Sequence, residues 1–194
     1  MNPRGELQAQ IAQLGGGSIL EYFDRIKKRY VTPNGCFGMK TSWSDFAPVI
    51  ELGLFDRMFT NPAIIYLDRR DIVLQAISCY RARESGLWHL ADGENALVNR
   101  AIRYDGLAIK EFFDALIAEK HEWEEFFCAR GIVPLRLYYE DLVGNMGSGV
   151  EQIAELLGLT EVAPIAWPLP RVIKLGGAES DEWANRFREQ FLTA

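Results

Sequence analysis

The chain of 194 residues has little of the chemistry that metal and redox sites require. It holds two histidines, His89 and His121, so arithmetic excludes a site built from several histidine ligands. Its three cysteines, Cys36, Cys79 and Cys128, are widely spaced and form no C-x-x-C pair, which leaves a zinc or thiol-redox motif without support. We therefore expect no metal, and the unpaired cysteines indicate a reducing, cytoplasmic compartment.

Long apolar segments and an excess of positive charge are missing as well. No apolar run approaches the roughly 18 residues of a membrane-spanning helix, and the first residues lack the apolar core of a signal peptide. The net charge is -6, so avid, sequence-independent binding to nucleic acid or to an anionic membrane is not expected. A small basic pocket remains compatible with this charge. The apolar content of 48% and the length predict one globular domain over residues 1–194.

Short apolar strands alternate with helical patterns along the chain. A continuous apolar run predicts a strand over 63–67, which should be buried on both faces. A second strand is predicted over 132–138, interrupted by Pro134, and a short extended stretch over 36–39. Apolar residues at helical spacing predict helices over segments 6–14, 20–30, 46–54, 72–83, 107–129, 150–157 and 183–191. This order predicts an α/β domain with a mainly parallel sheet flanked by helices.

Capping residues predict where three of these helices begin or end. Gly131 follows the long helix at a position where a left-handed cap is common. Ser148 and Glu151 have the S-x-x-E spacing of a capping box, and Ser180 precedes the apolar positions of the last helix. We expect Ser148 and Ser180 to begin their helices.

Two arginines stand where the strand over 63–67 gives way to a helix. In open α/β sheets, ligands bind beyond the carboxyl ends of the strands, where helix amides and the helix dipole favour an anion. Arg69 and Arg70 would add charge-assisted bonds to phosphate oxygens, and Ser78, in the spacing R-x7-S, would add a hydroxyl. The ordinary structural alternative pairs the arginines with Asp68 and Asp71 and leaves Ser78 as a small helix residue. The spacing by itself favours that alternative.

The segment around these residues resembles a known family. The run over 66–89, YLDRRDIVLQAISCYRARESGLWH, is similar to the corresponding segment of the bacterial trehalose 2-sulfotransferase family. That family is related to the lipopolysaccharide and Nod-factor sulfotransferases and, more distantly, to the cytosolic ones. Further matches follow in order: EYF at 21–23, TPNGCFGMKTSW at 32–43, YEDL at 139–142 and EWANRFREQF at 182–191. The central run is the most specific of them, and YEDL by itself is weak.

The resemblance implies a fold, a donor and a donor site. The fold is the P-loop nucleotide-binding type of α/β domain, and the sulfuryl donor is 3'-phosphoadenosine 5'-phosphosulfate. Arg70 and Ser78 are then expected to hold the donor's 3'-phosphate, which agrees with the anion site inferred from the residues. Arg69 and Lys40 are further candidates on the donor side, although a lysine at a strand end is often only a surface residue.

The reaction also needs a base and an acceptor site. An attacking hydroxyl must lose its proton, so a carboxylate or imidazole within hydrogen-bond reach is required. The resemblance implies that Glu21 is this base, whereas the ordinary alternative is a solvated glutamate favoured by the helix dipole. Trp88, His89 and Trp43 are candidates for the acceptor side, because an indole face suits a sugar ring. Their ordinary alternatives are core packing for the tryptophans and solvation for the histidine.

The sequence departs from the family at its start. The family has a strand and a P-R-S-G-[ST]-[ST] loop that cradles the 5'-phosphosulfate, but only Pro3, Arg4 and Gly5 stand there, so the first strand is missing. A late or truncated start, a degraded relative, and an unusual loop over 1–5 all fit this observation. Losing a central strand exposes sheet edges, which a homodimer or an exchange of strands would cover.

Two functions from different classes follow. The first is a sulfotransferase that moves a sulfuryl group to a hydroxyl of a carbohydrate acceptor, such as trehalose, a glycolipid or a lipopolysaccharide. The alternative is a catalytically inactive binding or assembly protein on the same fold, which has lost the donor-binding loop. A P-loop kinase has little support, because no G-x-x-x-x-G-K-[ST] motif is present.

Overall fold

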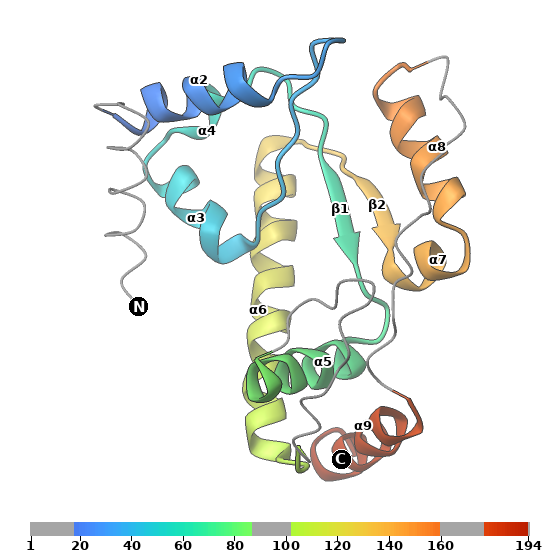
Figure 1. Cartoon of the computed structure of the whole chain (residues 1–194). Helices are drawn as coiled ribbons and strands as arrows, with labels where there is room; N and C mark the ends of the chain where they lie inside the picture. The colour runs from blue at the N-terminus through green and yellow to red at the C-terminus, as the bar shows by residue number, and fades with distance from the viewer. Residues whose placement is uncertain (1–17, 87–101, 160–176, 194) are drawn as a thin grey trace. The chain divides into compact units, whose positions relative to one another are not determined.

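The computed structural model describes residues 18–86, 102–159 and 177–193 (Figure 1). The chain divides into two compact units, residues 1–62 (unit 1) and 63–194 (unit 2), and each is described by itself. The helix predicted over 6–14 lies outside the described residues.

The described part of unit 1, residues 18–62, contains the helices α2 (Ile19–Tyr30), α3 (Trp43–Glu51) and α4 (Phe55–Met58). A capping box begins α2, because the Ser18 hydroxyl accepts the Glu21 backbone N–H and the Glu21 carboxylate accepts the Ser18 backbone N–H. One buried cluster of this unit contains Phe23, Leu54 and Met58, and Phe46 and Phe55 are buried as well. The helix predicted over 20–30 is therefore confirmed, with a start that its capping residues explain.

The connection between α2 and α3 differs from the prediction. Residues 36–39 form no strand, and Lys40 lies exposed in an irregular segment. The helix predicted over 46–54 begins earlier, because Ser42 caps it by accepting the Asp45 backbone N–H. It ends at Glu51, and Gly53 then takes a left-handed conformation with φ of 62°.

Unit 2 alternates strands and helices in the order that the sequence predicts. Its elements are β1 (Ile65–Asp68), α5 (Ile72–Ser85), α6 (Gly106–Arg130), β2 (Leu135–Tyr138), α7 (Tyr139–Gly144), α8 (Met146–Leu156) and α9 (Ala178–Phe191). The two strands pair in parallel, with Asp68 opposite Tyr138, so their carboxyl ends meet at one edge (Figure 1). The predicted α/β class is confirmed in this form.

The two faces of β1 differ in how far they are covered, whereas Leu137 of β2, the parallel partner of Leu67, is only 5% exposed. Tyr66 packs on α6 with its ring centroid 5.5 Å from that of Phe127 and 6.2 Å from that of Trp123. Ile65 and Leu67, which alternate with Tyr66, are 40% and 55% exposed. The prediction that this strand is buried on both faces is therefore wrong, because α6 covers only the face that carries Tyr66.

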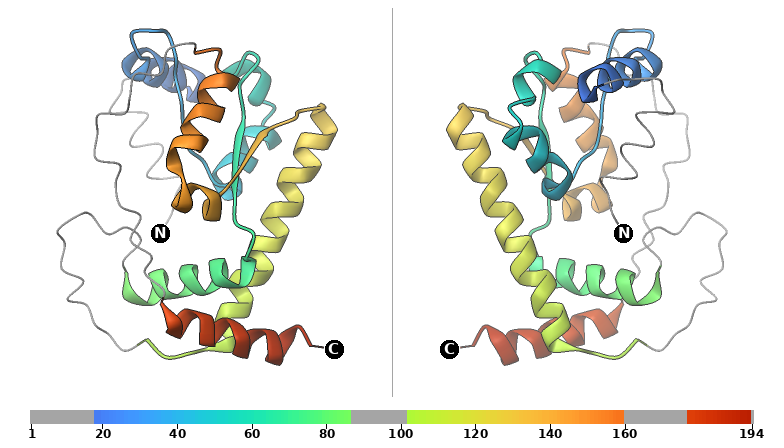
Figure 2. Two further views of the ribbon diagram at one scale, coloured as in Figure 1. Left: turned by 90° about the vertical axis from the view of Figure 1, so that its right-hand side faces the viewer. Right: turned by 90° about the vertical axis from the view of Figure 1, so that its left-hand side faces the viewer.

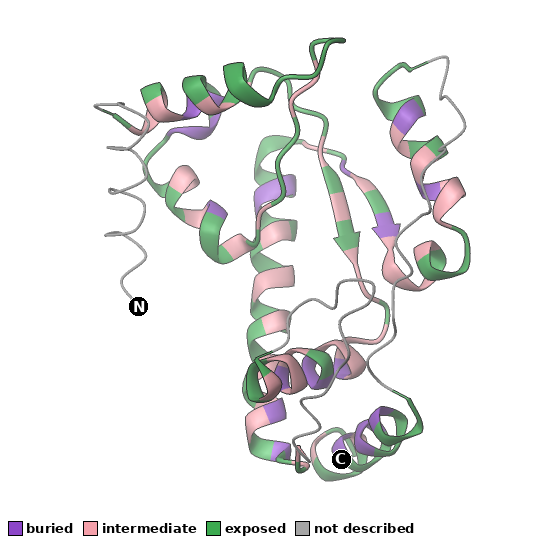
Figure 3. Ribbon diagram, viewed as in Figure 1, coloured by how far each residue is buried: buried purple, intermediate pink, exposed green. Residues whose placement is uncertain are grey.

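Three helices form the main core of unit 2. The amino-terminal part of α6 packs against α5, which also packs against α9, while the carboxyl-terminal part of α6 lies along the sheet (Figure 2). Buried residues gather where α5, α6 and α9 meet (Figure 3). Ile77, Ile109 and Phe187, one from each helix, are fully buried. Gly131 ends α6 with φ of 61°, as its position predicts.

Two predicted helix caps are wrong. Asn145, not Ser148, caps α8, and its side-chain oxygen accepts the Ser148 backbone N–H at 3.2 Å. Gly177 precedes α9, and Ser180 lies inside its first turn with only 7% exposure. Both helices begin a few residues earlier than their apolar periodicity indicates, because glycine, serine and acidic residues make up most of their first turns.

Phe187→Ala is expected to destabilise the protein by about 3 to 5 kcal/mol, because it removes a fully buried ring and leaves a cavity between α9 and α6. The measurement is urea unfolding followed by circular dichroism. Glu182→Ala, an exposed change on the same helix, should stay within about 0.5 kcal/mol of the parent protein. Equal effects of the two changes would contradict the core described here.

Candidate anion-binding site

Charged side chains gather at the edge where β1 and β2 end. The turn after β1 leads into α5, and β2 runs directly into α7, so two segments about seventy residues apart in the chain meet there. We call this group the strand-end cluster, and it contains Asp68, Arg69, Arg70, Asp71, Lys120, Glu140, Asp141 and Arg188. It holds four cationic and four anionic side chains, so its formal charge is balanced.

Arg70 binds Asp141 across the two strands. Its Nη1 and Nη2 donate to Oδ1 and Oδ2 of Asp141, each at 2.6 Å, and its guanidinium lies 4.2 Å from the centre of the Tyr138 ring. The bond from Arg70 holds the pKa of the Asp141 carboxyl below its usual value, so that carboxylate stays ionised at neutral pH. Both side chains are more than half exposed, at 51% and 61%.

Arg69 lies deeper in the same edge. Its side chain is 18% exposed, and its guanidinium packs 4.4 Å from the centre of the Tyr139 ring. Glu140 is its charged neighbour, but the distance of 3.7 Å from Nε to the carboxylate exceeds a hydrogen bond. The Arg69 Nε is buried and has no hydrogen-bond partner within the described ranges. An unsatisfied buried donor of this kind favours an anion nearby.

The two aspartates beside the arginines have other partners. Lys120 from α6 contacts the Asp68 carboxylate at 2.8 Å and donates to the Arg69 carbonyl at 3.2 Å. Asp71 caps α5 by accepting the Leu74 backbone N–H, and it also accepts a bond from Arg188 of α9 at 2.7 Å. The structural alternative, in which Asp68 and Asp71 neutralise the two arginine side chains, is therefore wrong.

Ser78 lies exposed on α5, two turns after Arg70. Its hydroxyl makes no hydrogen bond to any residue that the structure describes. Ser85, on the same helix, instead donates to the Arg81 carbonyl at 2.7 Å, as helical serines commonly do. The role predicted for Ser78 in binding the donor stays a prediction.

The other predicted site residues lie in unit 1 or outside the described residues. Glu21 closes the capping box of α2, Lys40 is exposed in the connection after it, and Trp43 begins α3 with its ring against Phe46. These three residues belong to unit 1, which is described by itself. Trp88 and His89 fall in the range 87–101, outside the described residues. The roles of these five residues stay predictions.

Sequence reasoning missed four members of the strand-end cluster, which are Lys120, Glu140, Asp141 and Arg188. The signal for Glu140 and Asp141 was the YEDL match, which begins directly after the second predicted strand. Since parallel strands bring their carboxyl ends to one edge, that position is equivalent to the position of Arg69 and Arg70.

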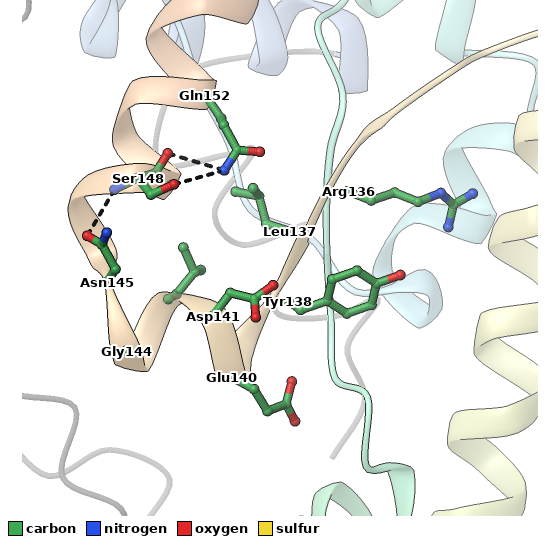
Figure 4. Close-up of a pocket in the computed structure, with 11 residues that line it drawn as sticks. Arg136, Leu137, Tyr138, Glu140, Asp141, Gly144, Asn145, Ser148 and Gln152 are labelled. Atoms are coloured by element: carbon green, nitrogen blue, oxygen red, sulfur yellow. Dashed lines mark hydrogen bonds between the residues drawn. The ribbon is translucent and has the colours of Figure 1, made fainter.

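A pocket of about 400 Å³ opens beside the cluster, between β2, α7 and α8. Tyr138 and Asp141 line it from the strand end, and Asn145, Ser148 and Gln152 line it from α8 (Figure 4). The α8 helix approaches α7 closely because position 149 is a glycine, where a Cβ would clash with Leu142. The described part of the chain holds no cluster of three metal-ligating side chains and no helix long and apolar enough to cross a membrane.

β1 is followed by two arginines and then by a helix with an exposed serine, and it lies in a parallel pair of strands. This arrangement is typical of anion-binding sites in α/β proteins. The family model of the Stf0 sulphotransferases matches residues 17–190, so the chain belongs to that family. This result confirms the resemblance seen in the sequence.

Two curated relatives are similar to this chain. It is 25% identical to trehalose 2-sulfotransferase of Mycobacterium tuberculosis over 82% of its own length, and 26% identical to trehalose 2-sulfotransferase of Mycolicibacterium smegmatis over 81%. The alignments span 63% and 62% of those relatives.

Asp71→Ala is expected to lower the free energy of unfolding by about 1 to 2 kcal/mol, because it removes both the cap of α5 and the partner of Arg188. Asp71→Asn keeps an oxygen for the Leu74 N–H and should cost less than about 1 kcal/mol. Urea unfolding of the two variants separates the cap from the ion pair. Equal losses would show that the cap contributes nothing.

Proposed function

We propose that this chain transfers a sulfuryl group from 3'-phosphoadenosine 5'-phosphosulfate to a hydroxyl of a carbohydrate, and that Arg70 and Ser78 bind the donor's 3'-phosphate. The observation that carries the proposal is the R-x7-S pair at the strand end, in a chain of the Stf0 sulphotransferase family. Both relatives are named trehalose 2-sulfotransferase, which supports a carbohydrate acceptor. These comparisons do not favour the catalytically inactive alternative.

The residues at the strand end fit a phosphate. A guanidinium has five N–H donors, and Arg70 uses two of them on Asp141, so three remain. The buried Nε of Arg69 is a further donor without a partner among the described residues, and the Ser78 hydroxyl is a third type of donor. The amino-terminal end of α5 adds the positive end of its dipole. Together these groups supply charge and direction for a phosphate dianion.

The reaction needs a proton acceptor, and Glu21 is our candidate. The donor supplies the sulfuryl group, which bonds to the acceptor oxygen as its bond to the 5'-phosphate oxygen breaks. The proton of the acceptor hydroxyl passes to the Glu21 carboxylate, which supports attack by a weak nucleophile. The capping bond from Ser18 to Oε2 of Glu21 restrains the side chain, which suits a group that must meet a hydroxyl in one orientation. Its assignment rests on the family resemblance.

Arg70→Ala is expected to weaken binding of 3'-phosphoadenosine 5'-phosphate by at least about ten-fold, because it removes a charge-assisted contact to the 3'-phosphate. Ser78→Ala removes one neutral donor and should weaken binding by about two- to ten-fold. Isothermal titration calorimetry measures both.

Ser85→Ala is the matched control, because its hydroxyl already bonds to the backbone of the same helix. Its affinity should equal that of the parent chain. A folded parent chain that does not bind the nucleotide, or binding that Arg70→Ala leaves unchanged, would contradict the proposed donor site.

Glu21→Gln is expected to reduce turnover by about 10²- to 10⁴-fold while leaving donor affinity unchanged, because the amide cannot accept the proton. The glutamine oxygen can still accept the Ser18 N–H, so α2 keeps its cap. Transfer of ³⁵S-labelled sulfate from the donor to trehalose, followed by chromatography, measures turnover. Asp24→Asn, an exposed change on the same helix, should keep full activity. Full activity in Glu21→Gln would remove this residue from the mechanism.

A further inference from the structure

The carboxylate of Asp141 binds both terminal nitrogens of the Arg70 guanidinium, which are the donors that best fit a phosphate. We propose that Asp141 determines anion specificity at the donor site, because it holds the Arg70 guanidinium until a phosphate dianion displaces it. This inference rests on the proposed function, in which Arg70 binds the 3'-phosphate of the donor. Asp141 would then be a competitor for Arg70 and not a residue that orients Arg70 toward the donor.

The bonds of Arg70 support competition. Both Nη atoms, which form the fork that grips two oxygens of an anion, donate to the two oxygens of Asp141 at 2.6 Å. The stacking of the guanidinium on Tyr138 at 4.2 Å keeps the side chain on the β2 side of the edge. Ser78 lies on α5, which leaves the sheet from β1 (Figure 1). A phosphate shared by Arg70 and Ser78 therefore requires the guanidinium to turn from α7 toward α5.

The charge balance of the strand-end cluster supports the same conclusion. Each of its four cationic side chains already lies beside a carboxylate, so an incoming phosphate competes with a carboxylate for charge at each of them. The Arg70–Asp141 pair has the most exposed side chains in the cluster, at 51% and 61%, whereas Asp68 beside Lys120 is 17% exposed. Water can solvate the Asp141 carboxylate after a phosphate replaces it, so the free-energy cost of breaking an ion pair is smallest at Arg70–Asp141.

Competition of this kind makes the site selective for charge. A phosphate dianion interacts more strongly with a guanidinium than a carboxylate does, whereas chloride binds it too weakly to displace Asp141. Asp141 therefore excludes small anions from Arg70 and admits a nucleotide that carries a 3'-phosphate. Without this carboxylate, Arg70 binds phosphate more tightly and is also open to chloride.

The test compares the parent chain with Asp141→Asn by calorimetry, with 3'-phosphoadenosine 5'-phosphate and with adenosine 5'-phosphate, which lacks the 3'-phosphate. Since an exposed ion pair changes an equilibrium constant by a factor of about two to ten, Asp141→Asn should bind the first nucleotide about two- to ten-fold more tightly. Its affinity for the second nucleotide should stay unchanged. Added chloride should weaken binding of the first nucleotide more steeply in Asp141→Asn than in the parent chain.

Three controls separate competition from other effects. Asp114→Asn removes one negative charge from a similarly exposed ion pair on α6, that with Lys110, so it should leave both affinities unchanged. The increase in nucleotide affinity caused by Asp141→Asn should vanish in the Arg70→Ala background, because that background has no guanidinium for Asp141 to bind. Asp141→Ala should show the same gain, and thermal unfolding should show that each variant is folded.

The outcomes are distinct. If the parent chain binds 3'-phosphoadenosine 5'-phosphate and the folded Asp141 variants bind it equally or more weakly, the competition is wrong and the proposed donor site stands. If neither the parent chain nor the Asp141 variants bind the nucleotide while folded, both the competition and the proposed donor site fail.

Discussion

The parallel pairing of β1 and β2 is the constraint on which the rest of unit 2 depends. Because Asp68 lies opposite Tyr138, the turn after β1 and the start of α7 end up at one edge, although about seventy residues separate them in sequence. Arg70 donates hydrogen bonds to Glu140 and Asp141 and so links the two segments, and Lys120 of α6 donates to the Arg69 carbonyl in the turn after β1. A one-residue slip of β2 would turn the side chains of the strand to the opposite faces and shift the start of α7, which follows directly, away from its place beside Arg70.

Local sequence signals predict the residues of the candidate anion site, but they do not predict which residues bind Arg70. The apolar run before Arg69, the helix that follows and the R-x7-S spacing all lie within one continuous segment, and the structure places them as expected. The partners of Arg70 could not be found in the same way, because they depend on the register of a strand from another part of the chain. The structural alternative assigned Asp68 and Asp71 to the arginines because they are neighbours in sequence. In three dimensions α6 and α9 supply Lys120 and Arg188 for those two aspartates.

The errors in the prediction have a common physical origin. Ser148 and Ser180 have side chains that can cap a helix, but Asn145 and Gly177 are the residues that begin those helices. Several residues near each helix start can serve as a cap, and the sequence does not show which of them does. The apolar run of β1 indicated two buried faces, whereas Leu67 is 55% exposed. Hydrophobicity reports the tendency of a residue to be buried and carries no information about which element covers it. The long helix α6 was predicted within one residue at each end, because its Gly131 cap is unambiguous.

The contact of Lys120 with two consecutive residues affects how a ligand would bind at this edge. Its ammonium holds the Asp68 carboxylate and the Arg69 carbonyl at once, which fixes the backbone of the turn between β1 and α5. The conformational entropy of that turn is therefore lost when the chain folds and not when a ligand arrives. In the proposed donor site, only the exposed guanidinium of Arg70 would reorient on binding, so ligand binding would order one side chain and leave the backbone of the turn unchanged.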